Sequence, residues 1–267
     1  MANPLMIAPG KAAKLDGRDP DDTAYVGSEE EARAGLLADA NEIDKLQDKL
    51  YAEGKRSLLV ILQGMDTSGK DGTIRGVFNT TGPLGVSVTA FRKPSEEELA
   101  HDFIWRAHMA APRRGTIGIF NRSHYEDVLV VKVRRFAPAK EIEKRYDQIN
   151  AFEKMLTENG TTVLKFMLHI SKKEQKERLQ ERLDDPKKHW KFNPGDLDDR
   201  KLWSDFQDAY DTMLERCSTD WAPWYVIPAD KKWARNAAIA KIVRKTLEDM
   251  DPSYPKVTWD PKSFKVE

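Results

Sequence analysis

Short apolar runs recur along the chain, separated by longer stretches in which apolar residues repeat at helical spacing. The runs are continuously hydrophobic, which is typical of strands buried on both faces of a parallel sheet. They cover residues 57–63, 86–91, 116–121, 162–168 and 224–228. The helical stretches cover residues 70–79, 95–111, 139–159, 172–184, 197–217 and 231–249. This alternation predicts a three-layer α/β fold with right-handed crossovers and five parallel strands.

The start of the chain and the stretch after the fourth run indicate how the molecule is organised. Residues 1–30 mix Pro, Gly, Asp and Ala without periodicity, so we expect an extended N-terminal arm that lies on the surface or on a partner. Helical spacing begins at Glu30 and continues to Tyr51. We treat residues 31–267 as a single domain with a lid inserted at about residues 171–200.

Composition narrows the classes of partner. Lys+Arg and Asp+Glu both number 44 in 267 residues, so no net charge attracts nucleic acid, and any polyanion must meet a local basic patch. No apolar run approaches the length of a membrane span, and the N-terminus lacks the pattern of a secretory signal. The single cysteine, Cys217, excludes an internal disulfide and fits a reducing cytosol. We therefore expect a cytoplasmic protein that binds neither nucleic acid nor membranes.

A glycine-bounded loop follows the first apolar run directly. Residues 64–72 match the spacing G-x-x-x-x-G-K between a predicted strand and a predicted helix. Glycine permits backbone angles that a Cβ forbids, so successive N–H groups can point at phosphate oxygens in front of the helix. The lysine adds a charge that can follow a transferred phosphoryl group. The candidate phosphate ligands are Gly64, Thr67, Ser68, Gly69, Lys70 and Gly72.

Two carboxylates distinguish this loop from the usual pattern. Asp71 stands after the lysine, where Ser or Thr normally contacts magnesium, and Asp66 lies inside the loop. A carboxylate beside phosphates is repelled unless a cation lies between them. Asp66 is therefore our candidate metal ligand, for Mg²⁺ with Mn²⁺ as the alternative. For Asp71 two interpretations stay open, namely that it contacts the phosphate group or that it caps the following helix.

Polar residues also follow the third apolar run. In phosphoryl-transfer folds the neighbouring strand usually ends in a metal-orienting carboxylate, but here it ends in Asn121, so Glu126 and Asp127 are the alternative candidate helpers for Asp66. Arg122 stands where α/β sheets bind ligands, and its planar fork suits phosphate; the alternative is a capping ion pair. We interpret His124 as a hydrogen-bonded structural residue rather than a phosphoryl carrier.

Basic residues follow the second and fourth runs. Arg92 and Lys93 come after the second run, a position that faces the acceptor in small-molecule kinases, although Lys93 also fits a surface charge. In residues 172–191, Arg178 and Arg182 are four residues apart and share one helix face. This basic strip can bind a longer polyanion than one triphosphate. The alternative is a solvated helix with paired Glu and Arg side chains.

Three motifs together resemble the polyphosphate kinase 2 family. They are Gly-Met-Asp-Thr-Ser-Gly-Lys-Asp-Gly at 64–72, Phe-Asn-Arg-Ser-His-Tyr-Glu-Asp at 120–127 and Asp-Pro-Lys-Lys-His-Trp-Lys at 185–191. The similarity extends over about residues 35–250, with the motifs in matching order. The resemblance implies a P-loop kinase fold similar to thymidylate kinase, with a helical lid.

The resemblance also implies an activity, which is reversible, Mg²⁺-dependent transfer of phosphate between inorganic polyphosphate and nucleotides. Many family members carry Asp where this chain has Asn121, so the second metal carboxylate stays unassigned. The site residues that the resemblance implies are Asp66 and Lys70 at the loop and metal, Arg122 on phosphate, Arg178 and Arg182 from the lid, and Lys187 and Lys188, more weakly, along the polyphosphate chain.

The motif at residues 120–127 is similar to that of a subgroup that phosphorylates both AMP and ADP. We therefore expect AMP and ADP as acceptors and ATP as a product, with guanine nucleotides as further candidates. The alternatives are a polyphosphate:ADP phosphotransferase that does not use AMP, an ATP-dependent nucleoside monophosphate kinase, and a regulatory binding protein without turnover. The resemblance also implies a homo-oligomer, either a dimer or a tetramer.

Overall fold

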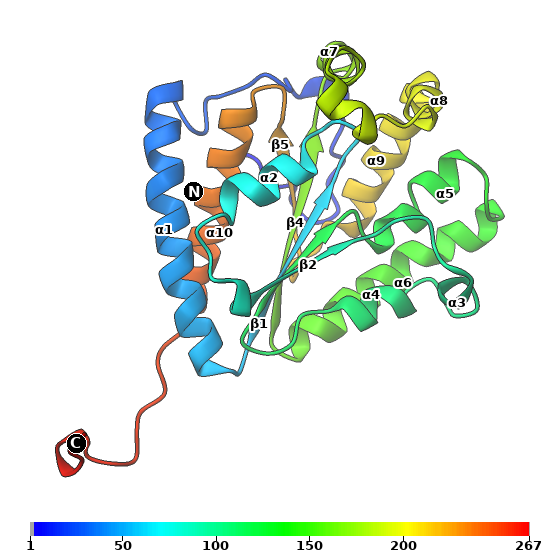
Figure 1. The fold of residues 1–267 in the computed structure, drawn as a ribbon. Coiled ribbons are helices and arrows are strands. Elements are labelled where there is room, and N and C mark those ends of the chain that lie inside the picture. The colour runs from blue at the N-terminus through cyan, green and yellow to red at the C-terminus, as the bar shows by residue number, and fades with distance from the viewer. Residues whose placement is uncertain (1–2, 267) are drawn as a thin grey trace.

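The computed structural model describes residues 3–266, which are built around a parallel sheet with strand order β2-β3-β1-β4-β5 (Figure 1). The strands are β1 (Ser57–Gln63), β2 (Val86–Ala90), β3 (Ile117–Asn121), β4 (Thr161–His169) and β5 (Trp224–Pro228). The predicted α/β fold with five parallel strands is confirmed. No predicted strand end differs from the observed one by more than one residue.

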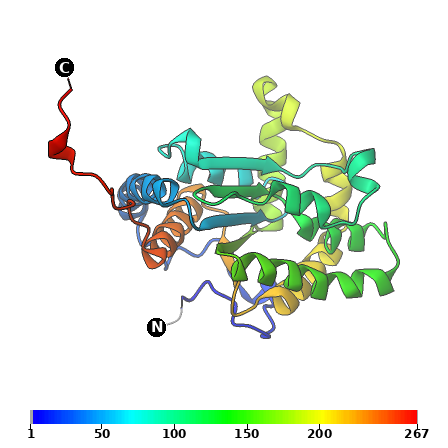
Figure 2. The same ribbon diagram turned by 90° about the horizontal axis from the view of Figure 1, so that it is seen from below.

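Helices cover both faces of the sheet, so the strands are buried on both sides (Figures 1 and 2). One face carries α1 (Glu29–Glu53), α2 (Lys70–Val77) and α10 (Lys232–Met250), and the other carries α4 (Trp105–Ala110), α6 (Ala139–Glu158) and α9 (Trp203–Cys217). Side chains of β1 alternate between the two cores. Leu58 and Val60 pack toward α1 and α10, whereas Leu59 and Ile61 pack toward α6 and α9. This double burial explains why the strand sequences are continuously hydrophobic.

Two long predicted helices are each divided in the structure. The helix predicted over 95–111 is wrong, because α3 (Glu96–Leu99) and α4 are separate. The Asp102 carboxylate accepts hydrogen bonds from the backbone N–H groups of Ile104 and Trp105, at 2.9 and 3.1 Å, and so starts a second helix. The stretch 197–217 is divided at Leu202 into α8 (Gly195–Lys201) and α9. The Leu202 N–H bonds the Asp199 carbonyl three residues back, which ends the α-helical ladder.

The first described residues of the N-terminal arm lie along the outer edge of β5. Met6 forms an antiparallel bridge with Tyr225. The Ile7 N–H donates to the Trp224 carbonyl at 2.8 Å, and the Val226 N–H donates to the Leu5 carbonyl at 2.8 Å. Because these bonds satisfy backbone groups of an edge strand, the arm covers an edge that would otherwise be exposed.

The remaining elements surround the carboxyl ends of the strands. They are the 3-10 helix η3 (His124–Asp127), α5 (Val130–Val133), α7 (Lys172–Asp184) and the 3-10 helix η4 (Pro186–Lys191). The lid segment, residues 171–200, contains α7, η4 and most of α8. Among the described residues, every helix is too short or too polar to cross a membrane.

Candidate active site

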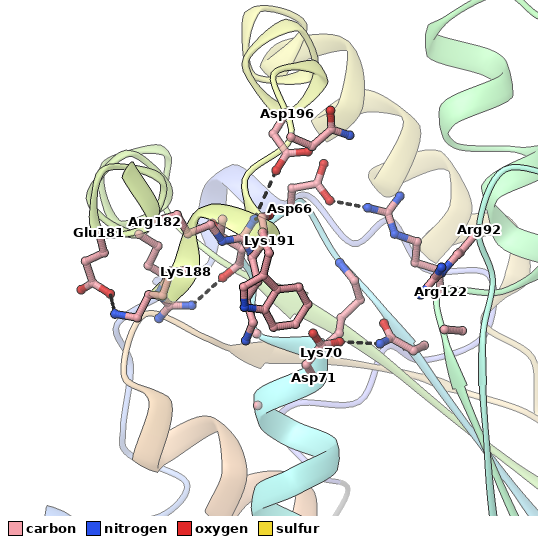
Figure 3. Close-up of a pocket in the computed structure, with 18 of the residues that line it drawn as sticks. Asp66, Lys70, Asp71, Arg92, Arg122, Glu181, Arg182, Lys188, Lys191 and Asp196 are labelled. Carbon is pink, nitrogen blue, oxygen red and sulfur yellow. Dashed lines mark hydrogen bonds and ion pairs between the residues drawn. The ribbon is translucent and has the colours of Figure 1, made fainter. Parts of the chain in front are cut away.

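A cavity of about 550 Å³ opens where β1 and β3 end, between α2 and the lid segment. Carboxylate and basic side chains from several elements face this space together (Figure 3). The predicted site residues that line it are Asp66, Thr67, Gly69, Lys70, Asp71, Gly72, Arg92, Asn121, Arg122, Arg178, Arg182 and Lys188. The structure therefore brings together most of the residues that the sequence singled out.

The other predicted residues lie outside this cavity. Ser68 is buried, and Gly64 and Glu126 line a small cavity that shares Asp66 and Arg122 with the main one. Lys93 and Lys187 are exposed and do not line the main cavity. Their positions match the surface-charge alternative.

Backbone geometry makes residues 64–69 a cradle. Gly64 has φ 150°, Thr67 has φ 67°, and Gly69, the N-cap of α2, has φ 103°. A Cβ on Gly64 would lie 2.7 Å from the Leu168 carbonyl oxygen, so β4 behind the loop excludes a side chain there. Gly64 and Gly69 are therefore required both by their positive φ and by the protein atoms packed against them.

Two hydroxyl groups in the cradle lack a protein partner. Thr67 Oγ1 and Ser68 Oγ are buried, and neither has a hydrogen-bond partner within the structure. Buried hydroxyls are normally satisfied, because an unmade hydrogen bond costs about 1–3 kcal/mol. Both groups lie at the N-terminus of α2, where the helix dipole favours an anion. Thr67 also lines the cavity, so its orphaned hydroxyl is the feature expected of a site that a phosphate oxygen fills.

Lys70 is folded against the loop. Its Nζ donates to the Gly64 carbonyl at 2.7 Å and to the Met65 carbonyl at 3.3 Å. Burial, together with the charge of Arg122, lowers the pKa of Lys70 from 10.5 to about 8. The ammonium group is thus held at the phosphate cradle, where a bound anion would stabilise its charged form.

Asp66 and Arg122 form an ion pair across the cavity, as Figure 3 shows. Arg122 Nη1 also lies 3.4 Å from Glu126 Oε2, and Glu126 and Asp66 raise the pKa of Arg122 further above its usual value. Arg122 adopts φ 62°, which turns its side chain back over the loop after β3. The capping alternative for Arg122 is not what its contacts show, since both of its acidic partners face the cavities.

Asp71 does not cap α2. The N-cap is Gly69, and no side-chain capping bond is present. Instead the Asp71 carboxylate accepts a hydrogen bond of 2.6 Å from the Asn121 side-chain amide. The capping interpretation of Asp71 is therefore wrong, and the pair connects the start of α2 to the end of β3.

A second carboxylate lies near Asp66. Asp196, at the start of α8, is buried and lines the cavity, and burial together with the charge of Asp66 raises its pKa to about 6. A divalent cation bound between two carboxylates would remove their mutual repulsion. Among the described residues, no group of three or more His, Cys, Asp or Glu side chains could hold a metal by itself. The donor set instead fits Mg²⁺, which commonly takes one or two carboxylates and completes its shell with phosphate oxygens and water.

Arg178 is held rigidly by the core of the protein. Its side chain is 6% exposed and donates to the carbonyls of Thr67, Ser68, Ala229 and Asp230. Arg182, one turn later on α7, is more open and contacts the Lys191 carbonyl at 2.9 Å and Asp196 at 3.3 Å. The two arginines therefore differ, because Arg178 braces the phosphate loop while Arg182 lies in the cavity wall.

Sequence reasoning missed several residues at the cavity. Asn193, Asp196 and Lys232 line it, and Arg235 holds the loop through the Ser68 carbonyl. Trp190 and Lys191 in η4, which belong to the motif at residues 185–191, line it as well. The side chain of Trp190 is 77% exposed, with Lys191 Nζ 5.0 Å from its ring centre. For η4 the basic composition was a usable signal. For Asp196 and Arg235 nothing in the local pattern marks them.

A buried polar network supports the segment that carries Arg122. His124 is fully buried and shares Glu153 with Tyr125, at 3.4 and 2.8 Å. Lys165 Nζ completes the network, 2.5 Å from Glu153 and 2.6 Å from the Cys217 carbonyl. Burial alone would raise the pKa of Glu153, but the charge of Lys165 and the His124 hydrogen bond bring it below its usual value. The structural interpretation of His124 is confirmed.

Removing one charge of this network should destabilise the fold strongly. We expect Lys165→Met to lower the free energy of unfolding by about 3–5 kcal/mol, because it leaves the Glu153 carboxylate buried without a cation. Urea denaturation at pH 7 measures the change. The double variant Glu153→Gln/Lys165→Met should recover most of the loss, and a double variant no more stable than Lys165→Met would contradict this account.

Comparison with known proteins gives one family. The family model described as polyphosphate kinase 2 matches residues 27–255. An AMP/ADP-polyphosphate phosphotransferase of Meiothermus ruber is 51% identical over 251 residues, which cover 94% of each chain. An ADP-polyphosphate phosphotransferase of Rhodopseudomonas palustris is 39% identical over 263 residues, or 93% of this chain and 91% of that one.

A solved structure shares the whole fold. The crystal structure of a polyphosphate kinase 2 from Arthrobacter aurescens superposes with a TM-score of 0.93 at 45% identity, and the match covers 97% of this chain and 93% of that one. A second match, to a putative polyphosphate kinase 2 from Pseudomonas aeruginosa, has a TM-score of 0.82 at 31% identity and covers half of that chain.

Proposed function

The chain belongs to the polyphosphate kinase 2 family, and from this premise we propose that it transfers the terminal phosphoryl group of inorganic polyphosphate to AMP and to ADP, forming ADP and ATP. One observation carries the proposal. A relative 51% identical over 94% of both chains is named for this activity, and the phosphate cradle here opens into a basic cavity of matching chemistry.

The side chains around the cradle can perform the transfer mainly by position and charge. Phosphoryl transfer needs an attacking and a leaving oxygen in line, and charge that spreads over the moving group must be neutralised. The loop N–H groups and Lys70 hold the phosphoryl group at the N-terminal end of α2. Arg122 faces it from β3, and Arg182 faces it from the lid segment. A nucleotide phosphate is already ionised at neutral pH, so the site needs no strong general base.

We propose Asp66 as the residue that would hold Mg²⁺, with Asp196 nearby. The fit rests on their mutual repulsion, which raises the pKa of Asp196, and on the single pairing of Asp66 with Arg122 across the cavity. Bound there, the ion would neutralise charge between the donor and acceptor phosphates. Asn121 is occupied by Asp71, so we do not assign it to the metal.

Three finer points are further proposals. The single cysteine, Cys217, is buried, which fits a protein that works in the reducing cytoplasm. Guanine nucleotides are candidate acceptors, and a homo-oligomer of two or four copies is the expected assembly from the family resemblance.

A second candidate function has its own support. The Rhodopseudomonas palustris relative, 39% identical, is named for ADP alone, so a polyphosphate:ADP phosphotransferase that does not use AMP is the alternative. An assay of AMP, ADP, GMP and GDP, each with polyphosphate and without ATP, separates the two. We expect ADP and ATP from AMP, resolved by chromatography.

The outcomes of that assay are distinct. Conversion of ADP but not AMP would support the alternative, whereas transfer to AMP only when ATP is the donor would contradict both polyphosphate-dependent functions. The Lys70→Ala variant, purified identically, controls for a contaminating adenylate kinase, because only the contaminant's activity would survive in it.

The shifted pKa of Lys70 predicts how phosphate binding depends on pH. In the ligand-free protein Lys70 loses its proton near pH 8, whereas bound phosphate stabilises the ammonium form. Affinity for polyphosphate should therefore be highest below pH 8 and fall as pH rises above it, approaching about tenfold per pH unit. Calorimetric titration with polyphosphate between pH 7 and 9 measures this slope. The Lys70→Met variant should show a flatter profile, and an equally flat wild-type profile would contradict the prediction.

A further inference from the structure

Arg235 is a buried arginine that the proposed chemistry does not use. It lies in the first turn of α10, its side chain is 2% exposed, and its Nη1 donates to the Ser68 carbonyl at 3.1 Å. Its Nε and Nη2 donate to the side-chain oxygen of Asn236. Across the described part of the chain, no carboxylate comes within ion-pair distance of it. Burying a guanidinium without a carboxylate partner lowers the stability of the fold, which suggests that Arg235 has a role beyond stability.

A second guanidinium reaches the same carbonyl. Arg178 Nη1 lies 3.3 Å from the Ser68 carbonyl oxygen and 2.9 Å from that of Thr67. Burial, and repulsion by Arg178, lower the pKa of Arg235 to about 9. Two arginines from α7 and α10, far apart in sequence, thus converge on one peptide group of the phosphate loop. Glu174 offsets part of the charge of Arg178, and nothing offsets that of Arg235.

The loop is also shaped around Arg235. A Cβ on Gly69 would lie 1.8 Å from Arg235 Nη1, and a Cβ on Gly72 would lie 3.2 Å from Nη2. Both glycines of the Gly-Lys-Asp-Gly segment therefore leave room for the guanidinium, which packs against the start of α2 and does not line the cavity. The glycine at 72 has no other close neighbour that requires it.

We propose that Arg235 is a positioning residue for the phosphate-binding loop. The carbonyl of Ser68 and the N–H of Gly69 belong to one planar trans peptide and point in opposite directions. By holding the carbonyl from behind, Arg235 aims the Gly69 N–H into the cavity, which Gly69 lines. Its uncompensated charge also lies directly behind a site for a polyanion, so anion binding offsets the cost of burying it.

This inference rests on the proposed use of polyphosphate, and its test separates the two. Arg235→Met keeps most of the side-chain volume but removes the charge and the bond to Ser68. The matched control is Arg244→Met, nine residues later on α10, which breaks partly buried ion pairs to Asp39 and Glu248 and does not touch the loop. Each variant is assayed for kcat, for KM of polyphosphate and of AMP, and for the rise in melting temperature that pyrophosphate causes without nucleotide.

We expect Arg235→Met to raise KM for polyphosphate at least tenfold, to change KM for AMP less than threefold, and to lose most of the stabilisation by pyrophosphate. Arg235→Lys, which keeps the charge with a shorter reach, should lie between wild type and Arg235→Met. Gly72→Ala places a Cβ 3.2 Å from Arg235 Nη2, which the guanidinium accommodates by moving a few tenths of an ångström, so it should raise KM for polyphosphate less than Arg235→Met does.

Each outcome supports or contradicts either the proposed function or the role of Arg235. Wild type without polyphosphate-dependent turnover would remove the proposed function itself. An active wild type with Arg235→Met equal to Arg244→Met in KM and in the pyrophosphate shift would overturn the role of Arg235. If Arg235→Met does not fold, Arg235→Lys carries the test, and a wild-type KM for polyphosphate in that variant would likewise overturn the role of Arg235.

Discussion

Lys70→Ala is expected to lower kcat by at least about a thousandfold while the protein stays folded. Lys70 Nζ is the ammonium group closest to the cradle, bonded to the Gly64 carbonyl in the ligand-free state. In a water-excluded site, removing one group that stabilises transition-state charge commonly costs about 10²–10³ in rate, and Lys70 serves both binding and transfer. The steady-state rate of ADP formation from AMP and polyphosphate measures the loss.

The fold should survive because the wild-type lysine is itself costly to bury. Its pKa is lowered by burial, so its ammonium form gains nothing from the ligand-free fold. Lys70→Met, which preserves volume, tests for a cavity effect and should be as inactive as Lys70→Ala. Lys245→Ala, an exposed change on α10, should leave the rate unchanged. A Lys70→Ala protein with a normal circular dichroism spectrum and near-normal turnover would contradict the site.

Asp66→Asn is expected to lower kcat/KM at least about a hundredfold and to raise the Mg²⁺ concentration needed for half-maximal rate. Asparagine keeps the shape of the side chain but removes the charge that would bind the metal and that pairs with Arg122. Rates measured across a Mg²⁺ titration at fixed polyphosphate and AMP separate the two effects, because added Mg²⁺ can compensate for weak metal binding but not for a misplaced arginine.

Asp71→Asn is the matched control for that change. Asp71 lines the same cavity one turn away, but its carboxylate is engaged by the Asn121 amide. An asparagine at 71 can still bond Asn121, so we expect less than about a fivefold change in rate and an unchanged Mg²⁺ midpoint. If Asp71→Asn instead shifts the midpoint more than Asp66→Asn does, the metal belongs at the start of α2 and our assignment is wrong.

Much of the fold could be predicted because its determinants are local. A continuous apolar run such as residues 57–63 can be buried only between two layers, which makes it a strand of a parallel sheet. Glycines at 64 and 69, with a lysine directly after the second, are likewise a local signal for a phosphate cradle. Helix boundaries were harder, as Asp102 shows, because hydrogen bonds from two backbone N–H groups to its side chain outweigh apolar spacing over residues 95–111.

The role of each arginine, in contrast, depended on what surrounds it in space. Arg178 and Arg182 lie one turn apart on α7 and both line the cavity, yet Arg178 bonds four carbonyls, two of them in the phosphate loop, whereas Arg182 bonds the Lys191 carbonyl and Asp196. Arg235 carries no pattern at all, and it is recognised only once α10 packs beside the loop.

The sequence by itself determined the sheet and the position and glycine geometry of the loop after β1, since hydrophobic runs and glycine spacing act within a few residues. The tertiary structure alone decided which charges meet: that Asp66 pairs with Arg122, that Asp196 joins it from the lid segment, and that two guanidiniums hold one peptide of the cradle. The reason is physical. Charge pairing and burial depend on distance in space. Residues more than 100 positions apart in the sequence come close to each other only when the layers pack together.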